Sequence, residues 1–189
     1  MFAFDIETLG TKSNSAILSM ACIHFEPDQR YNYDDLLQSA FFAKFDIGYQ
    51  KTKFNRTINK STIDWWSKQC DHAKKKSFIP TPNDLKFEDG YELMRQWANS
   101  KSKNQKEWVW ARGNLDQSVL SDIEDQMEVK PIFFFNRWRD VRTAIDIFAA
   151  TETGYCDVPG FDPGAHVIKH DPVQDCAYDI MMLTHAGKE

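Results

Sequence analysis

The sequence predicts an α/β fold in which a mixed β-sheet is flanked by α-helices. Three apolar segments in the first quarter of the chain have the composition of strands, and from residue 61 onward helical periodicity alternates with short apolar runs. Strands followed by alternating helices and strands are typical of this fold class. With 189 residues, of which 42% are hydrophobic, the chain can bury a core without needing disulfides or a structural metal. We expect residues 1–189 to form one domain.

The first expected strand, residues 1–8, carries two acids within an apolar stretch. Alternate side chains of a strand leave the same face, so Asp5 and Glu7 should project side by side. Like charges at this separation repel each other unless a cation lies between them, and the usual cation is a hard divalent metal ion. The alternative is a strand end at which both acids reach solvent.

The other expected strands are short and mostly apolar, at residues 16–25, 40–45, 107–111 and 131–135. The second is apolar almost throughout, which is typical of a central strand. Because short connections join the first three, they suggest an antiparallel meander.

The expected helices show apolar residues at helical spacing, at residues 61–69, 88–100, 115–123, 140–150 and from 171 to about 183. The last begins near Asp171-Pro172, and proline suits the first turn of a helix. Residues 71–82 and 151–164 contain prolines, and glycines in the second case, and are expected to be loops.

Composition limits the function classes. A net charge of −5 argues against a protein that coats nucleic acid through bulk charge, but bound metal ions can supply local positive charge at a phosphodiester site. The scattered cysteines Cys22, Cys70, Cys156 and Cys176 show no zinc-ligand spacing and predict reduced thiols. No signal peptide or membrane-spanning run is visible, so we expect a soluble, cytoplasmic protein without membrane contact.

Further acids occur where a fold could bring them to the first strand. Asp116 stands at a strand-to-helix junction, where α/β sheets tend to place their ligands. Asp175 lies on the last helix, four residues before Asp179, and one of the two could point inward, where it would need a partner. His170 precedes this helix in a loop.

Three segments together resemble the exonuclease motifs of the DEDDh 3′–5′ exonucleases, a family with an RNase H-like fold. These segments are Asp5-Ile6-Glu7-Thr8, Asn114-Leu115-Asp116 and the run from His170 to Asp175. His170 stands five positions before Asp175, as in the histidine branch of the family. The resemblance is closest to the phage exonuclease A type, with support from residues 61–66, 136–143 and 170–180.

The sequence departs from the family pattern at one position and offers a second register at another. Leu115 occupies a place that is usually aromatic. His166 also lies five positions before an acid, Asp171, but Asp171 precedes Pro172 and is better suited to cap the helix.

The resemblance implies a metal-dependent 3′–5′ exonuclease that acts on nucleic acid with a free 3′ end and releases nucleoside 5′-monophosphates. Two Mg²⁺ or Mn²⁺ ions, about 3.5–4 Å apart, would be held by the four acids. Asp5 would bridge the ions, Glu7 and Asp175 would hold the ion that binds the attacking water, and Asp116 would support the other. His170 would be the general base, since a pKa of about 6.5 suits proton transfer at neutral pH.

Candidate substrate contacts come partly from the resemblance, which implies that Thr8 and Leu9 meet the terminal nucleotide. Trp65 and Trp66 are core residues or, alternatively, a rim that stacks a base, with Trp66 taken as the contact. Arg112, Arg139 and Arg142 are phosphate partners or form structural salt bridges. The run Lys74-Lys75-Lys76 is typical of a solvated face, and its alternative is contact with a phosphate backbone.

The sugar preference stays open at this stage. The phage-type resemblance favours DNA, whereas related enzymes trim RNA. Two further hypotheses are a non-catalytic nucleic-acid-binding accessory module and an RNase H-like endonuclease, and product lengths would separate an endonuclease from an exonuclease. The sequence leaves the oligomeric state undetermined.

Overall fold

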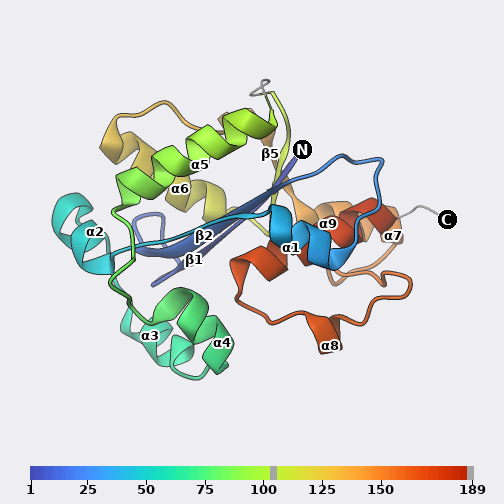
Figure 1. Cartoon of the computed structure of the whole chain (residues 1–189), viewed down its shortest axis with the longest axis horizontal. Coiled ribbons are helices and arrows are strands. Elements are labelled where there is room, and N and C mark those ends of the chain that lie inside the picture. Colours follow the sequence, from blue (N-terminus) through green and yellow to red (C-terminus); the bar gives the residue numbers. More distant parts are fainter. Residues whose placement is uncertain (103–105, 187–189) are drawn as a thin grey trace.

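A computed structural model describes residues 1–102 and 106–186 of the chain, so the expected single domain of residues 1–189 extends slightly beyond them. Its centre is a five-stranded sheet in the order β3-β2-β1-β4-β5 (Figure 1). The strands are β1 (Phe2–Thr8), β2 (Ile17–His24), β3 (Phe41–Lys44), β4 (Val109–Ala111) and β5 (Trp138–Asp140). The first three pair antiparallel, as the expected meander requires, and β4 and β5 add in parallel. The mixed sheet with flanking helices confirms the predicted α/β fold.

Helices connect and cover these strands. In chain order they are α1 (Tyr33–Ser39), α2 (Ile47–Phe54), α3 (Lys60–Trp66), α4 (Asp71–Ala73), the π-helical η1 (Lys74–Phe78), α5 (Phe87–Lys101), α6 (Leu115–Met127), the 3₁₀-helical η2 (Phe135–Arg137), α7 (Val141–Ala149), α8 (Pro163–His166) and α9 (Pro172–His185). No helix in the described part of the chain is both long and apolar enough to cross a bilayer.

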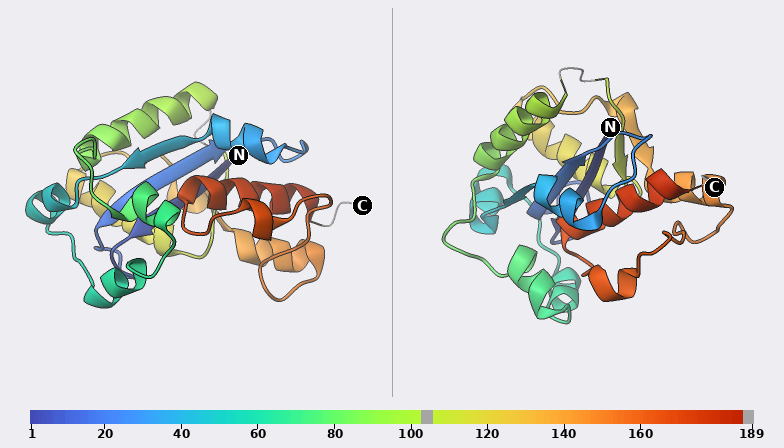
Figure 2. Two further views of the ribbon diagram at one scale, coloured as in Figure 1. Left: turned by 60° about the horizontal axis from the view of Figure 1, so that its bottom comes forward. Right: turned by 45° about the vertical axis from the view of Figure 1, so that its right-hand side comes forward.

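The two faces of β1 belong to different cores. Phe2, Phe4 and Ile6 pack against residues of α5 and α6 on one face. Ala3, on the other face, joins a core formed with α1, α7 and α9. Figures 1 and 2 show α5 and α6 on one side of the sheet and α1 and α9 on the other. The alternation of side chains along a strand therefore aims Asp5 and Glu7 at the α9 side.

The predicted cap of the last helix is confirmed. Asp171 is the N-cap of α9, and its side chain accepts a hydrogen bond from the Val173 N–H at 3.1 Å. Pro172 occupies the first helical position, where the missing N–H costs nothing. The helix expected at residues 61–69 begins slightly earlier, because Asn59 caps α3 by accepting from the Ser61 N–H.

The prediction of a strand at residues 131–135 is wrong. Ile132 and Phe133 are buried, but they enter the core from an irregular segment, and the strand that extends the sheet is β5, just after η2. The Ile132 N–H is satisfied by the Glu124 carboxylate at 3.2 Å, so this backbone needs no strand partner. Apolar composition therefore indicated the burial of Ile132 and Phe133, but neither the backbone conformation nor the exposure of Phe134 and Phe135, which are 42% and 79% exposed.

Several short helices were not expected. The predicted loop at residues 71–82 contains α4 and η1, and α8 begins at the end of the predicted loop 151–164. The helices α1 and α2 lie in segments for which no helix was predicted. Each buries only two side chains, Tyr33 and Leu36 in α1 and Gln50 and Phe54 in α2. Two buried positions are too few to establish helical periodicity in a sequence.

Gly90 is required where α5 crosses β3. A Cβ atom at position 90 would lie 2.5 Å from Cε1 of the buried Phe45 ring. We expect Gly90→Ala to lower the free energy of unfolding by about 1–3 kcal/mol, despite the higher helix propensity of alanine. Gly48→Ala in α2 is the matched control, because its added Cβ meets only Oδ1 of Asp46 at 3.2 Å. Chemical denaturation measures both, and equal stability of the two variants would contradict the packing argument.

Candidate active site

Two carboxylates of the site come from β1. Asp5 and Glu7 are partly buried while Phe4, Ile6 and Thr8 between and beside them are fully buried. Both acids stay on one face of a strand whose opposite face lies in the α5–α6 core. The strand therefore holds both carboxylates rigidly, at the end of the sheet nearest the start of α9.

Asp116 enters from the first turn of α6. Strand β4 pairs with β1 only at Phe2 and Ala3, so further along β1 the edge that faces β4 is not paired with that strand, while the other edge stays paired with β2. There the Ile6 N–H donates to Oδ1 of Asp116 at 3.0 Å. The carboxylate thus replaces a sheet hydrogen bond, and the same bond fixes Asp116 beside Asp5 and Glu7.

The α9 helix contributes Asp175 and Asp179, and both point inward. Asp175 accepts a hydrogen bond from the His170 N–H at 2.9 Å. Asp179, one turn later, accepts from the Arg112 Nε at 2.7 Å and is almost completely buried. The sequence suggested one inward acid on this helix, and the structure has two, one of which is paired with an arginine.

His170 stands over Glu7 and Asp175. Its Nδ1 lies 3.8 Å from Oε1 of Glu7, and its ring meets that of Trp65 edge-to-face with centroids 4.6 Å apart. The backbone at His170 is left-handed, with φ of 66°. This conformation is uncommon for a residue other than glycine. It allows the backbone N–H to bond Asp175 while the imidazole faces the acids.

Burial and mutual repulsion make these acids hard to ionise. Burial, and then the charge of Glu7, raise the pKa of Asp5 well above its usual value. Burial, followed by Asp175, does the same to the pKa of Glu7. Burial raises the pKa of Asp116 to about 7, although the Ile6 N–H opposes the shift, and burial with the charge of Asp179 raises that of Asp175 to about 7.

The donor set fits a divalent cation. Among the described residues, Oδ2 of Asp5 is a buried carboxylate oxygen with no hydrogen-bond partner. One potential ligand atom from each of Glu7, His170 and Asp175 lies within 4.8 Å of the other two. Clustered carboxylate oxygens are the ligands that Mg²⁺ and Mn²⁺ prefer, and a cation would offset the repulsion between them.

The structure does not support three of the expected substrate contacts. Trp66 is 0% exposed and donates from Nε1 to the Thr8 carbonyl at 3.1 Å, so it has no free face on which a base could stack. Leu9 is 5% exposed and packs in the same small core, and its N–H is bonded to the Ala16 carbonyl. Thr8 is also buried, and its hydroxyl donates to the Gly10 carbonyl. Trp65, 41% exposed beside His170, is the aromatic residue that faces outward.

The candidate arginines have different roles. Arg112 is held between Asp179 and the Gly154 carbonyl, so the structural salt bridge accounts for it. Arg139 donates to the nearby carbonyls of Asn136 and Trp138. Arg142 is exposed, and its charge lowers the pKa of Asp116 and of Asp179, so its guanidinium lies near the acids. Of the three, Arg142 is best placed to meet a phosphate.

The side-chain contacts of Asp171 with Gln174 and His72, next to His170, were not predicted from the sequence. The buried carboxylate of Asp171 accepts from the Gln174 Nε2 at 3.2 Å and contacts the His72 Nε2, on α4, at 2.8 Å. The Gln174 side chain in turn accepts from the Ile168 N–H. These bonds tie both ends of the His170 loop. The sequence indicates Asp171 only as a cap, and no spacing points to His72.

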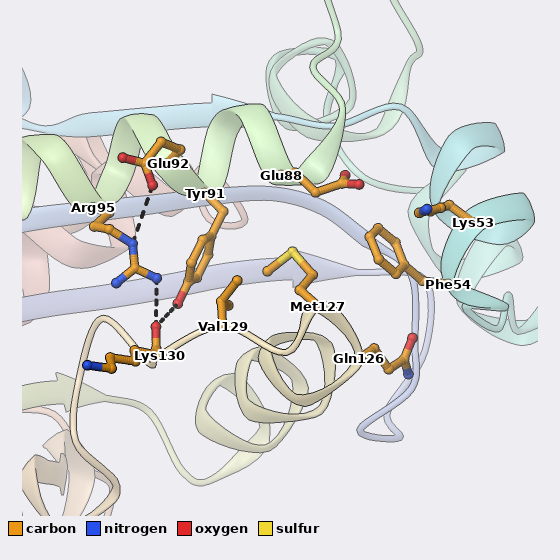
Figure 3. A pocket seen from close by; sticks show the side chains of 10 residues that line it. All are labelled: Lys53, Phe54, Glu88, Tyr91, Glu92, Arg95, Gln126, Met127, Val129 and Lys130. Atoms are coloured by element: carbon orange, nitrogen blue, oxygen red, sulfur yellow. Dashed lines mark hydrogen bonds and ion pairs between the residues drawn. The ribbon is translucent and has the colours of Figure 1, made fainter.

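A separate cleft of about 650 Å³ lies between α2, α5 and the end of α6 (Figure 3). Phe54, Tyr91, Met127 and Val129 line it among side chains of both charges. The Tyr91 hydroxyl and the Arg95 guanidinium both bond the Lys130 carbonyl, as Figure 3 shows. None of the clustered acids lines this cleft, so it is distinct from the candidate active site.

Comparison with known proteins covers nearly the whole chain. Residues 1–186 match the model of the Rv2179c-like 3′–5′ exoribonuclease domain family. An exodeoxyribonuclease of Enterobacteria phage T4 is 29% identical over 209 aligned positions, which cover 98% of this chain and 88% of that protein.

The raised pKa values predict that the metal-free protein loses stability as pH rises. Asp116 and Asp175 have folded pKa values of about 7, whereas an unfolded aspartate titrates at about 4. The folded state binds their protons more tightly, so their contribution is complete below about pH 4 and is lost as pH rises toward 7. With chelator present, we expect the free energy of unfolding to fall by several kcal/mol between these limits, since each pKa unit of each group corresponds to about 1.4 kcal/mol.

Asp5→Asn is the control for this titration. It removes one titratable carboxyl group from the cluster, so the fall with pH should become smaller while the shape of the residue is kept. Urea denaturation at a series of pH values measures both proteins. Stability that stays level or increases over this range in the unmodified protein would contradict the assignment of the pKa shifts.

Proposed function

Since this chain belongs to the Rv2179c-like 3′–5′ exoribonuclease domain family and is a hydrolytic 3′–5′ exonuclease, we propose that it removes nucleotides one at a time from the 3′ end of DNA as nucleoside 5′-monophosphates. One observation carries this proposal: carboxylates from β1, α6 and α9 converge beside His170 at one end of the sheet. The alternative substrate is RNA.

The four acids would hold the metal ions. Asp5 and Glu7 from β1, Asp116 from α6 and Asp175 from α9 are the proposed ligands of two Mg²⁺ or Mn²⁺ ions. When bound, such ions neutralise charge at the phosphate, activate the attacking water and stabilise the leaving 3′ oxygen. The unpartnered Oδ2 of Asp5, a residue whose pKa is raised by the charges of Glu7, Asp116 and Asp175, supports its place among the metal ligands.

His170 is the proposed general base. Burial, and then the charge of Lys169, lower the pKa of its imidazole, which is therefore neutral and able to accept a proton at pH 7. Oε1 of Glu7, 3.8 Å from Nδ1, helps to orient the ring. The water oxygen forms a bond to phosphorus, the bond from phosphorus to the 3′ oxygen of the preceding nucleotide breaks, and His170 takes the proton of the water.

Two exposed side chains are the proposed contacts to the terminal nucleotide. Arg142 lies near the acids without a salt bridge among the described residues, so its guanidinium can grip phosphate oxygens. Trp65, beside His170, takes the stacking role that the sequence suggested for Trp66, because it is 41% exposed whereas Trp66 is buried.

The sugar preference rests on the comparisons. The phage T4 relative, which aligns over almost the whole chain, is an exodeoxyribonuclease, whereas the description of the matching family is an exoribonuclease. We favour DNA on the similarity to the phage protein, and because the 61–66 and 136–143 segments resemble the same phage type. Both sugars therefore belong in the first assay.

Digestion of 5′-labelled single-stranded DNA and RNA tests this function. With Mg²⁺ or Mn²⁺ we expect a ladder that shortens from the 3′ end, faster on DNA, and no ladder with chelator or with Asp5→Ala. Internal cuts would indicate an endonuclease instead. Intact strands of both kinds with either metal would overturn the proposal.

Replacement of the base separates chemistry from metal binding. His170→Ala should lower kcat by about 100-fold or more, since general bases contribute roughly that much. The shift in Tm caused by Mn²⁺ should persist, because the four carboxylates remain. Glu7→Gln is the comparison variant and should reduce both the rate and the Tm shift. Unchanged hydrolysis by His170→Ala would refute its assignment as base.

A further inference from the structure

One segment of the chain has a net positive charge, although the chain as a whole is negative. Residues 47–78, which run from α2 through α3 and α4 to η1, contain eight Lys or Arg and two Asp, a net charge of +6. The whole chain has a net charge of −5, so the remaining residues together carry −11. We call residues 47–78 the basic arm. Its charge is opposite to that of the acid cluster and of the rest of the protein.

The basic arm lies against the candidate active site. The Asn59 N–H donates to the Leu9 carbonyl at 2.7 Å, so the arm meets the chain just after β1. Trp65 contacts the His170 ring, and His72 contacts Asp171. In Figures 1 and 2, α3 and α4 form a separate layer at the end of the sheet, next to the start of α9.

Structural contacts account for some of these cations. Arg56 is buried and pairs with Asp122, and Lys74 pairs with Asp71 at 3.0 Å. The Lys76 ammonium lies 4.0 Å from the centroid of the Phe42 ring. The middle lysine of this run is exposed, so only part of Lys74-Lys75-Lys76 behaves as a solvated face.

Two exposed lysines lie next to the residues that touch the His170 loop. Lys68 follows Trp65 by three residues, and its N–H bonds the Trp65 carbonyl at 3.1 Å. Lys75 follows His72 by three residues, across the junction of α4 and η1. Side chains three apart on a helical turn are neighbours. Neither ammonium group forms a salt bridge within the described part of the chain.

We propose that Lys68 and Lys75 on the basic arm bind backbone phosphates of a single DNA strand, on the 5′ side of the nucleotide that is being removed. This inference rests on the proposed function, which places the 3′ end at the acids beside His170. The strand leaves the site past Trp65 and crosses the basic arm, because this is the neighbouring surface with an excess of cations. A positively charged surface that follows the backbone is the usual device for holding single strands.

The phosphate contacts explain how a protein of negative net charge keeps hold of a polyanion. The acids repel a strand, and the cations that oppose this repulsion are concentrated on one segment. Phosphate contacts bind any sequence, so the basic arm provides affinity without base preference. It also favours longer strands, because a dinucleotide has no phosphates that reach beyond the site.

The affinity of the protein for single-stranded DNA, measured in the presence of chelator to prevent hydrolysis, tests the role of the basic arm. The probe is fluorescently labelled single-stranded DNA of about 12 nucleotides, followed by anisotropy over a range of salt concentrations. For Lys68→Ala with Lys75→Ala, we expect roughly tenfold weaker binding at low salt. The slope of log K against log salt should fall in magnitude by about 1.4, since each phosphate contact on a single strand contributes about 0.7.

The control is Lys101→Ala with Lys130→Ala, which removes the same charge from exposed lysines outside the basic arm. It should bind as the unmodified protein does, and Lys68→Arg with Lys75→Arg should retain tight binding. Equal loss in the two alanine pairs, or no loss in either, would overturn the proposal. Thermal melting confirms that every variant is folded.

Hydrolysis of the p-nitrophenyl ester of thymidine 5′-monophosphate by the unmodified protein separates this proposal from the proposed function. This substrate has no upstream phosphates, so it reports on the proposed active site and not on the basic arm. Absence of hydrolysis would count against the proposed function, while the binding comparison would still decide the role of the basic arm.

Discussion

Repulsion among partly buried carboxylates is the constraint on which this structure depends. Asp5 and Glu7 are fixed by β1, and Asp116 and Asp175 are brought to them by the first turns of α6 and α9. Each arrangement has its own cause: strand alternation for the first two, the missing β4 partner of Ile6 for the third, and the His170 N–H for the fourth. Packing on both faces of the sheet supplies the stability that offsets this repulsion.

Much of the site could be predicted from the sequence because its signals are local. The spacing of Asp5 and Glu7 determines their common face once β1 is a strand, and Asp171-Pro172 marks the start of α9. Asp116 lies in the first turn of α6, after the short turn that follows β4, so its place near a strand end needed no knowledge of the tertiary structure. Local geometry combined with the order of the acids was sufficient for this part of the site.

The remaining features depend on contacts between distant segments. Trp65 and Trp66 are neighbouring residues of the same type, and only packing against Leu9 and Ala73 decides which one is buried. The apolar residues Ile132 and Phe133 fill the core without forming a strand, because Glu124 satisfies the backbone there. The contact of His72 with Asp171 joins residues 99 positions apart, and no local pattern encodes it.

The alternation along β1 also couples correct folding to activity. Phe4 and Ile6 face one core while Asp5 and Glu7 face the acids, so a slip of β1 by one residue against β2 would exchange the two sets. A slipped chain would bury both charges in an apolar layer and turn its aromatic rings toward the substrate. If these acids act as proposed, a mispaired sheet has no activity, and the specific activity of a preparation then measures its share of correctly registered molecules.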